Sequence, residues 1–365
     1  MNKLAIFPLR TLLFLFFFNY LLGEDDILHL VHADTTKGKM INGERVDIMI
    51  GHIHAYQDTI HMFCDFAYRY SSQNLMEFFS NVVIDDGHRI LRAEKIIYDE
   101  LKRKADCFKR VRISSETDSL YAEKFVYYFK DKKAEAEENL YLFDKGNRAS
   151  VWGDRGVYTT SNKKGDIYHN AKFEHSEEGG GDTLFITAAQ MHYEGLEPKR
   201  AIAVDSVVIQ QGDFYATCDS AYYLISEEKI FLRGNPQAWQ DDSEMNGDLI
   251  DVKLDSIEIN EIYLTENAQI KTLADSLAKK YNLLRGKSIQ VSLDEKRPRL
   301  VVARKNASSL YLIEDEGESE GTNAAIADSI ILYFYEGEVD SIAIIGGVEG
   351  AFYPIDHKGE IEIEY

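Results

Sequence analysis

The stretch Ala122-Glu123-Lys124-Phe125-Val126-Tyr127 defines a pattern that recurs through most of the chain. A small residue is followed by an acidic or polar residue, three further residues and a tyrosine. Close copies begin at Ala93, Gly153, Ala188 and Cys218, weaker copies begin at Gly247, Gly286 and Ala327, and Cys64 begins a copy one position out of step. The starts of the nine copies lie 29 to 41 residues apart. A drifting period of this length is typical of a repeat protein whose turns vary in length.

The residues between the copies alternate between apolar and polar with a period of two, which is typical of a half-buried β-strand. The apolar pairs are Val82 and Ile84, Val111 and Ile113, Leu140 and Leu142, Ala171 and Phe173, Val207 and Ile209, and Ala268 and Ile270. Polar turn segments such as Lys130–Lys133 lie between the two halves of each unit, so each unit is predicted to be two antiparallel strands. One unit has too little apolar surface to fold alone, and its neighbours must share a core. We therefore predict an all-β fold, an elongated repeat array of antiparallel strands.

Domain boundaries follow from the ends of this array. Lys3 and Arg10 precede the short apolar run Leu12–Phe18, so residues 1–23 are predicted to be a signal peptide, with an N-terminal anchor as the alternative. We expect residues 24–50 to form an N-terminal lead-in and first strand, and residues 51–314 to form the repeat array. Residues 315–323 are predicted to be an acidic loop, and 324–365 a terminal repeat with a C-terminal edge strand. Thr272–Leu284 departs from the alternation and reads as a short helix or a longer connection.

Composition excludes several function classes. A formal net charge of −21 argues against a nucleic-acid partner. Cys64, Cys107 and Cys218 are odd in number and have no C-x-x-C spacing, so buried thiols are expected. His52 and His54 on one strand face, with His61 opposite His54, could bind a metal ion, but a polar strand is the better interpretation. The common catalytic and nucleotide-binding motifs are absent from the sequence. We expect no enzyme activity, no cofactor and no metal.

Three phrases carry a family resemblance: Cys218–Tyr223, the stretch Gly234-Asn235-Pro236-Gln237-Ala238-Trp239, and Tyr281–Lys287. Their order over about Gly51 to Pro354 resembles the OstA-like proteins related to the periplasmic LptA-type lipopolysaccharide-transport domain, in the long version found in Bacteroidetes-type bacteria. The resemblance implies a folded-over, V-shaped β-jellyroll whose interior is an apolar slot for the acyl chains of lipid A. It also implies a periplasmic location, with association with a membrane as an alternative.

The same resemblance implies binding and transport, or bridging, of lipopolysaccharide or a related glycolipid across the periplasm to the outer membrane. Its partners would be other lipopolysaccharide-transport components, or a second copy joined end to end through sheet edges. The lipid species, and the choice between a bridge and a soluble carrier, stay open. Two alternatives also stay open: a structural β-scaffold of the envelope, and a β-helix that acts on or binds acidic polysaccharide.

Two sets of residues are candidates for the site. The apolar stripe is the candidate lipid-binding slot, because equivalent positions in stacked units line up in one row, although a closed core would show the same pattern. It consists of Ile84, Ile113, Leu142, Phe173, Ile209 and Ile270. The aromatic row could face a ligand, but stacked aromatic side chains are common cross-strand stabilisers, and the structural interpretation is favoured. It consists of Tyr98, Tyr127, Tyr158, Tyr193 and Tyr223.

Overall fold

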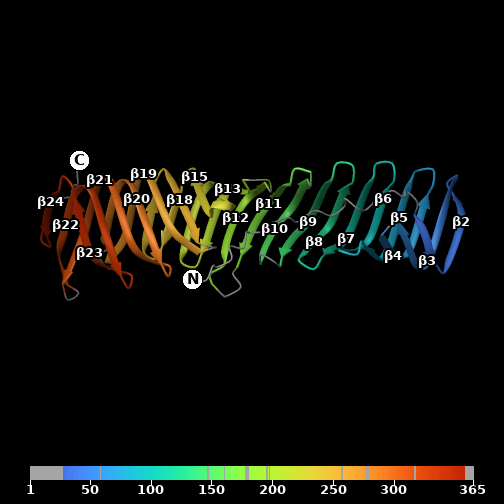
Figure 1. Ribbon diagram of the computed structural model, residues 1–365, viewed down its shortest axis with the longest axis horizontal. Helices are drawn as coiled ribbons and strands as arrows, with labels where there is room; N and C mark the ends of the chain where they lie inside the picture. Colours follow the sequence, from blue (N-terminus) through green and yellow to red (C-terminus); the bar gives the residue numbers. More distant parts are fainter. Residues whose placement is uncertain are drawn as a thin grey trace, which may run out of the picture. The chain divides into compact units, whose positions relative to one another are not determined.

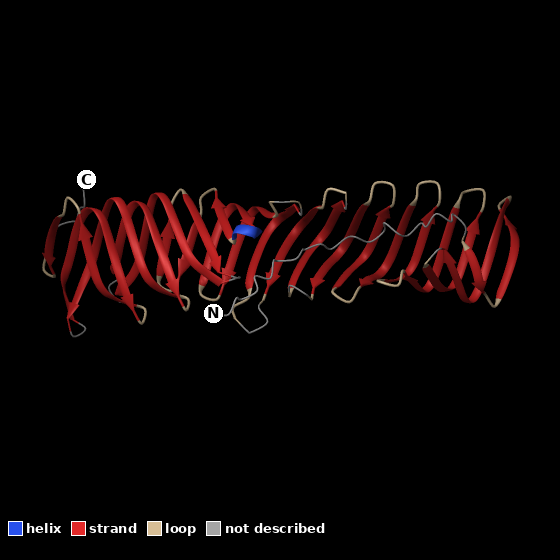
Figure 2. Ribbon diagram, in the orientation of Figure 1, coloured by secondary structure: helices blue, strands red, loops and turns tan. Residues whose placement is uncertain are grey.

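The computed structural model describes residues 28–57, 59–145, 148–159, 161–176, 181–194, 196, 198–255, 258–275, 280–315 and 318–357. The chain divides into two compact units: unit 1 is Met1–Glu178 with Ala189–Ala201, and unit 2 is Gly179–Ala188 with Ile202–Tyr365. Within the described residues nearly all of the structure is β-strand, and a short 3-10 helix, η1 (Ile225–Glu227), is the one helix (Figure 2). The predicted all-β class is confirmed.

The strands follow one another along the chain (Figure 1). Those of unit 1 are β1 (His29–His32), β2 (Thr35–Ile41), β3 (Glu44–Gln57), β4 (Ile60–Tyr70), β5 (Leu75–Asp85), β6 (Ile90–Asp99), β7 (Lys104–Ser114), β8 (Asp118–Tyr128), β9 (Lys133–Asp144), β10 (Ala149–Thr159) and β11 (Lys164–His175). The residues of β12 (Leu184–Glu194) and β13 (Arg200–Gln211) are shared between the two units.

The remaining strands belong to unit 2. They are β14 (Phe214–Leu224), β15 (Lys229–Arg233), β16 (Gln237–Gln240), β17 (Ser243–Asn246), β18 (Leu249–Asp255), β19 (Glu258–Asp275), β20 (Lys280–Asp294), β21 (Arg297–Asp315), β22 (Glu318–Tyr335), β23 (Glu338–Ile345) and β24 (Glu349–Pro354).

Consecutive strands pair in antiparallel ladders. In unit 1 both β1 and β2 pair with β3, and each strand from β3 to β10 pairs with the next. In unit 2 the ladders continue from β18 through β19, β20, β21 and β22. The shorter strands β15 and β16 pair with the second and first halves of β14 and so lie one after the other along it. All ladders described are antiparallel. The β-helix alternative is therefore wrong, because a β-helix stacks its strands in parallel.

Alternate long strands change direction at a corner near their middle; these are β3, β5, β7, β9, β11, β13, β19 and β21. Two consecutive residues there have left-handed φ angles, for example 59° and 53° at Ser80 and Asn81 of β5. The same left-handed pair occurs at Lys109-Arg110, Glu138-Asn139, His169-Asn170, Asp205-Ser206, Glu266-Asn267 and Lys305-Asn306. Such angles are uncommon for residues other than glycine. The register of the ladders also shifts at these positions, so each corner divides its strand into two arms.

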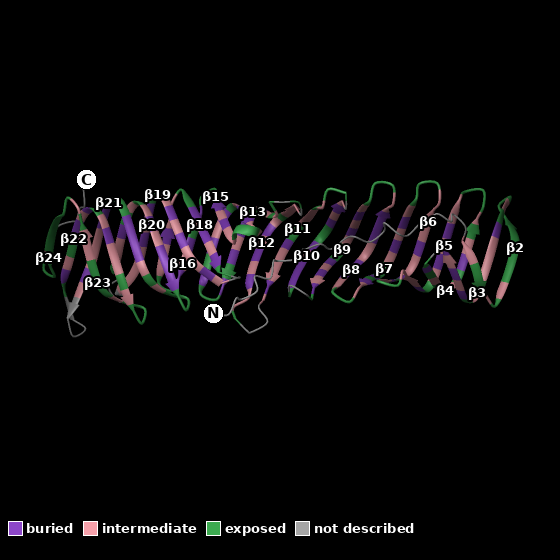
Figure 3. Cartoon of the chain, viewed as in Figure 1, coloured by how far each residue is buried: buried purple, intermediate pink, exposed green. Residues whose placement is uncertain are grey.

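Both arms of a strand pack against the same core. In β7, Cys107 precedes the corner and Ile113 follows it, yet both lie in one cluster of buried side chains. Figure 3 shows buried segments alternating with exposed ones along the strands. The predicted folded-over arrangement is thus confirmed: the sheet bends at the corners, and the inward side chains of the two arms share one core.

The acidic residue of the sequence repeat holds the corner of the neighbouring strand. Asp65 accepts hydrogen bonds from the Ser80 hydroxyl and the Asn81 amide, both at 2.8 Å. In unit 2 the two carboxylate oxygens of Asp248 accept from the Asn267 amide at 3.1 and 3.0 Å. Charge-assisted hydrogen bonds of this kind are stronger than neutral ones. They offset part of the cost of the left-handed backbone.

The small residue of the repeat lies buried beside the corner. A Cβ added to Gly153 would come within 2.3 Å of Ile167 Cγ2, so this position has no room for a side chain. Cys64 and Cys218 occupy the same repeat position, and both are buried free thiols, as is Cys107. Burial raises the pKa of the Cys64 thiol to about 12 and that of Cys218 to about 11. The expected buried thiols are confirmed.

The structure differs from the sequence prediction at two connections. The predicted acidic loop at 315–323 is wrong from residue 318 onward, because β22 begins at Glu318 and pairs with β21. Ladder hydrogen bonds use backbone atoms alone, so an acidic composition does not prevent pairing. A short helix was one alternative for Thr272–Leu284, but the described residues of this segment form the end of β19 and the start of β20.

The chain ends are only partly described. The lead-in expected at 24–50 contains β1, β2 and the first half of β3. The predicted signal peptide at 1–23 and the last residues of the predicted edge strand, 358–365, lie outside the described residues. No helix in the described part of the chain is long and apolar enough to cross a membrane.

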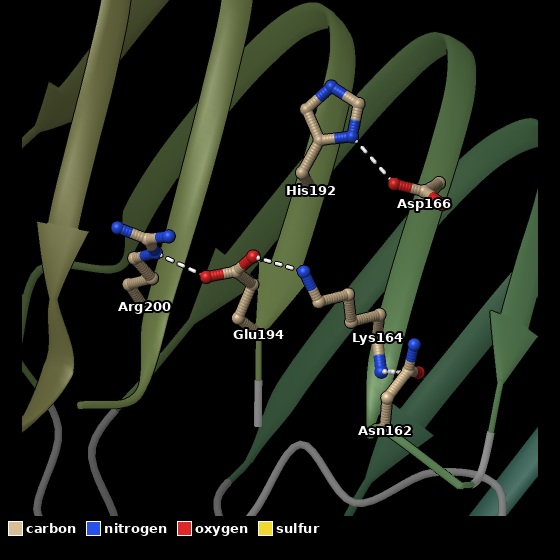
Figure 4. A network of polar contacts seen from close by, with 6 residues as sticks. All are labelled: Asn162, Lys164, Asp166, His192, Glu194 and Arg200. Carbon is tan, nitrogen blue, oxygen red and sulfur yellow. Dashed lines mark hydrogen bonds and ion pairs between the residues drawn. The ribbon is translucent and has the colours of Figure 1, made fainter. Parts of the chain in front are cut away.

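A polar network ties the last strands of unit 1 together on their outer face (Figure 4). Glu194 of β12 pairs with Arg200 and accepts from Lys164 Nζ of β11 at 2.8 Å. On the same two strands, His192 Nδ1 lies 2.6 Å from Asp166 Oδ1. The hydrogen bonds that Glu194 accepts from Arg200 and Lys164 lower the pKa of its carboxyl to about 2.

This pKa gives Glu194 a pH-dependent contribution to stability. A carboxyl whose folded pKa is lowered from 4.5 to about 2 stabilises the fold fully above pH 4.5, and the contribution disappears as the pH falls towards 2. We expect Glu194→Gln to lower the melting temperature at neutral pH, and the difference from wild type to shrink steadily below pH 4.5. Glu116→Gln, in an exposed turn, is the control. A difference between Glu194→Gln and wild type that does not change with pH would contradict the assignment.

Candidate functional site

An apolar row crosses eight strands of unit 1 on the buried face, from β4 to β11. Its members lie directly opposite one another on successive strands, so the row is continuous in register. We call this the inner row; it consists of Met62, Ile84, Leu91, Ile113, Leu120, Leu142, Val151 and Phe173.

Four of the six residues of the predicted apolar stripe lie in the inner row. Ile113 and Leu142 are 3% and 9% exposed, while Ile84 and Phe173 are partly buried against the same core. The other two, Ile209 of β13 and Ile270 of β19, are buried in unit 2. Ile270 lies opposite Met245 and Leu284. The structure therefore brings four of the predicted residues together and places the other two on separate strands of unit 2.

Sequence reasoning missed the members of the inner row on the alternate strands. These are Met62, Leu91, Leu120 and Val151, and each lies two positions before the small residue of a repeat. The same position is apolar in the later copies, at Ile186, Ala216, Met245, Leu284 and Ala325. An apolar residue two positions before each small residue is the signal that could have found them.

The aromatic residues form a second row on the other arm of unit 1. Tyrosines and small residues alternate across the strands in the order Tyr98, Ala105, Tyr127, Ala134, Tyr158 and Gly165. A Cβ on Gly165 would lie 3.1 Å from the Tyr158 ring and 3.9 Å from Tyr193 Cβ. The small residues therefore leave the space that the rings fill. Tyr127 and Tyr158 belong to the same buried cluster as Ile113 and Leu142, which favours the structural interpretation of this row.

In unit 2 the corresponding row begins at Tyr223 and continues with aliphatic residues. The order is Tyr223, Ile230, Val252, Ile262, Val291, Val301, Leu332 and Ile342. Burial raises the pKa of the Tyr223 hydroxyl to about 12, so this side chain is firmly in the core. Ile262 is fully buried, but Ile342 on β23 is 38% exposed. The apolar interior of unit 2 thus reaches solvent at its last strands.

Both terminal groups of strands have edges without a ladder partner among the described residues. β23 and β24 pair only with β22, and β1 and β2 pair only with β3. Ile345, Val348 and Phe352 are more than half exposed at the last edge, as is Met40 at the first. Unpaired edges with exposed apolar side chains are suited to pairing with another chain.

His61 was expected opposite His54, but it lies opposite Tyr56, and its ring contacts the His54 ring diagonally. His52 is a corner residue with φ 43° and pairs with Asp34 at 2.9 Å. His54 lies opposite Phe63, and its Nε2 is 3.0 Å from His61 Nδ1. Within the described ranges, no group of three or more metal-ligating side chains is placed to hold a metal ion.

The sequence of most of unit 1 matches a known family. Residues 25–179 match the sequence model of the family described as OstA-like protein. This segment of the chain is OstA-like. The OstA-like segment contains β1 to β11, and with them the inner row and the tyrosine row up to Gly165.

Other comparisons add little to the OstA-like match. The curated protein sequences contain no match to this chain. Among solved structures, one similar chain is LptH from Pseudomonas aeruginosa, described as the LptA-homologous periplasmic component of the conserved lipopolysaccharide transport device. It has 10% sequence identity and a TM-score of 0.17, and the match covers 48% of this chain and 82% of that one.

The repeat of the OstA-like segment continues beyond the match. Unit 2 has the same combination of small residue, acidic residue and left-handed pair in Gly247, Asp248, Glu266 and Asn267. Glu266 also pairs with Lys287 of the next repeat at 3.3 Å. The two units are therefore built by the same local rules, although the family match ends at residue 179.

Proposed function

We propose that this protein binds lipopolysaccharide or a related lipid A-type glycolipid along the inner row and carries or bridges it across the periplasm to the outer membrane. The inner row itself carries this proposal. Eight apolar side chains, one from each of eight successive strands, form a strip without a polar interruption. At roughly 4.8 Å between strands, the strip is on the order of 34 Å long. The OstA-like match of the same segment supports this function.

The fold offers a way for acyl chains to enter. The described ladders join neighbouring strands within an arm, and the two arms of a strand are joined at its corner. Parting the arms by bending at the corners would therefore break no ladder hydrogen bond. Acyl chains between the arms would replace contacts between the inner row and the tyrosine row. Each methylene buried there contributes about 0.8 kcal/mol.

The partly open ends suit the bridging part of the proposal. Ile342 of β23 continues the buried row of unit 2 to a position that is 38% exposed, and the edges of β23 and β24 have no described partner. A second copy, or another component of a lipopolysaccharide-transport system, could add strands there. The acyl chains would then pass from one interior to the next without crossing water.

Native mass spectrometry with site-specific photo-crosslinking tests the proposal. A photoreactive residue is placed at inner positions 113, 142 or 173, and at the outward positions 106, 135 and 166 of the same strands as controls. Asp106, Glu135 and Asp166 belong to one outward row on the other arm. We expect purified protein to retain added lipopolysaccharide, and crosslinks to lipid to form at the three inner positions alone.

The outcome also separates a carrier from a purely structural scaffold. A folded protein that retains no glycolipid, or that crosslinks equally from inner and outward positions, would favour the scaffold. Circular dichroism of each substituted protein shows whether it is folded, so a failed crosslink from an unfolded variant is not counted.

A further inference from the structure

The outer face of unit 1 has its own row, on the arm that bears the inner row. Six outward side chains lie opposite one another on successive strands from β6 to β11: Arg92, Arg112, Tyr121, Tyr141, Trp152 and Lys172. We call them the outer stripe. Two arginines lie at one end, and Lys172, which pairs with Glu174 at 3.4 Å, lies at the other. Three aromatic rings lie between them, over a length on the order of 24 Å at roughly 4.8 Å per strand.

The first two members of the outer stripe are like charges that lie directly opposite each other. Arg92 and Arg112 are direct cross-strand partners, and both are exposed. Like charges directly opposite one another destabilise a sheet. Among the described residues, neither guanidinium has an ion-pair or hydrogen-bond partner. In a chain of net charge −21, two adjacent uncompensated arginines are suited to an anion from outside the fold.

The carboxylates beside the outer stripe are already occupied. Glu94 pairs with Arg110 at the corner, and Glu123 accepts from the Arg110 backbone amide at 3.2 Å. Asp154 accepts from the Asn170 amide at 2.9 Å. These acids hold corners, so they do not neutralise the two arginines.

The aromatic members form a platform between the cations. The Tyr141 and Trp152 rings have centroids 5.1 Å apart, and Lys172 Nζ lies 4.8 Å above the Trp152 ring. Tyr121 is 43% exposed. Aromatic rings with a polar atom suit a ligand that is partly apolar and partly hydrated. The adjacent outward positions include Ser114 and Ser119, whose hydroxyls can donate and accept hydrogen bonds.

From this arrangement we infer that the outer stripe binds an acidic oligosaccharide, with its sugar rings on the aromatic platform and its acidic groups at Arg92 and Arg112. A single-stranded nucleic acid also stacks on aromatic rings, but it has one phosphate per base and needs a basic groove along its whole length. The outer stripe has cations only at its ends. A saccharide with few charges matches this spacing, and the site does not depend on lipid binding at the inner row.

The two tryptophans of the chain make the site measurable. Trp152 lies in the outer stripe and Trp239 in unit 2, so the full chain with Trp239→Phe reports on the outer stripe through Trp152 fluorescence. The probes are an oligogalacturonate, neutral maltoheptaose, inorganic phosphate and oligothymidylate. We expect the oligogalacturonate to change Trp152 emission saturably, and to bind more weakly as salt is raised.

Two variants separate a binding role from a structural one. Arg112→Glu places opposite charges at the mismatched pair, so it should weaken oligogalacturonate binding at least about tenfold while the melting temperature stays or rises. Arg155→Ser, which removes an outward arginine on the other arm, should leave binding unchanged.

Four results would overturn the inference: no saturable binding, equal binding of maltoheptaose, tighter binding of oligothymidylate, or wild-type affinity in Arg112→Glu. Binding of phosphate alone with the same affinity would reduce the site to an anion site and also overturn it. Lipid crosslinking from the inner row serves as a separate readout, since its failure would leave the oligosaccharide result unaffected.

Discussion

Replacing Leu120 by arginine is expected to destabilise unit 1 by about 3–5 kcal/mol. Leu120 is 2% exposed and lies in the inner row between Ile113 and Leu142. A guanidinium at this position would be buried among the aliphatic side chains of the inner row, and burial of a charge is costly. The substitution tests the packing of the inner row whether or not a lipid is present.

The measurement is urea unfolding of the full chain with Trp239→Phe, followed by Trp152 fluorescence so that unit 1 is observed separately. Leu120→Met is the matched control, because it conserves volume and polarity and should cost less than about 1.5 kcal/mol. A loss below about 1 kcal/mol in Leu120→Arg would mean that the inner row is accessible to water along its length.

A second large effect is expected at a corner of unit 2. Asn267 has φ 51° and donates to both oxygens of Asp248. Asn267→Val should cost about 2–3 kcal/mol, because a β-branched residue tolerates the left-handed region poorly and the two hydrogen bonds are lost. Both partners are at the surface, so the hydrogen bonds are the smaller part of this cost.

Asn267→Gly separates the two contributions. Glycine adopts the left-handed backbone without strain, so this variant should cost about 1 kcal/mol for the lost hydrogen bonds and the greater freedom of the unfolded chain. Unfolding is followed through Trp239 in the full chain with Trp152→Phe. Equal stability of the valine and glycine variants would show that the corner does not need a left-handed residue.

The alternation of apolar and polar residues predicted the strands well. Pairs such as Val111 and Ile113 lie two apart on one face of β7, and the polar segment at Lys130–Lys133 lies at the turn between β8 and β9. The small residue of the repeat was also predicted correctly as buried, as Cys64 and Cys218 show. These features depend on local burial, which a period of two reveals directly.

The corners could not be found from that period. Glu138-Asn139 and His169-Asn170 interrupt the alternation, and an interruption alone reads as a bulge, a turn or an exposed stretch. The asparagines are a clue, because asparagine tolerates left-handed angles better than most residues. Their acceptors Asp65 and Asp154 are on neighbouring strands, and Asp248 lies between β17 and β18. Only strand pairing places donor and acceptor together. The alternate members of the inner row were missed for the same reason.

The self-contained corner has a consequence for how such chains change length. A small residue, an acid and a left-handed pair on two successive strands supply everything that one fold-back needs. Duplication or loss of a segment of about 30 residues would therefore insert or remove two whole strands. Each of the remaining acids would still face its own left-handed pair. Loss of a single strand would instead set two strands of the same kind against each other, with two acids or two left-handed pairs at one corner. Growth in steps of two strands gives this architecture a reach that can be adjusted by recombination without redesign of its interior.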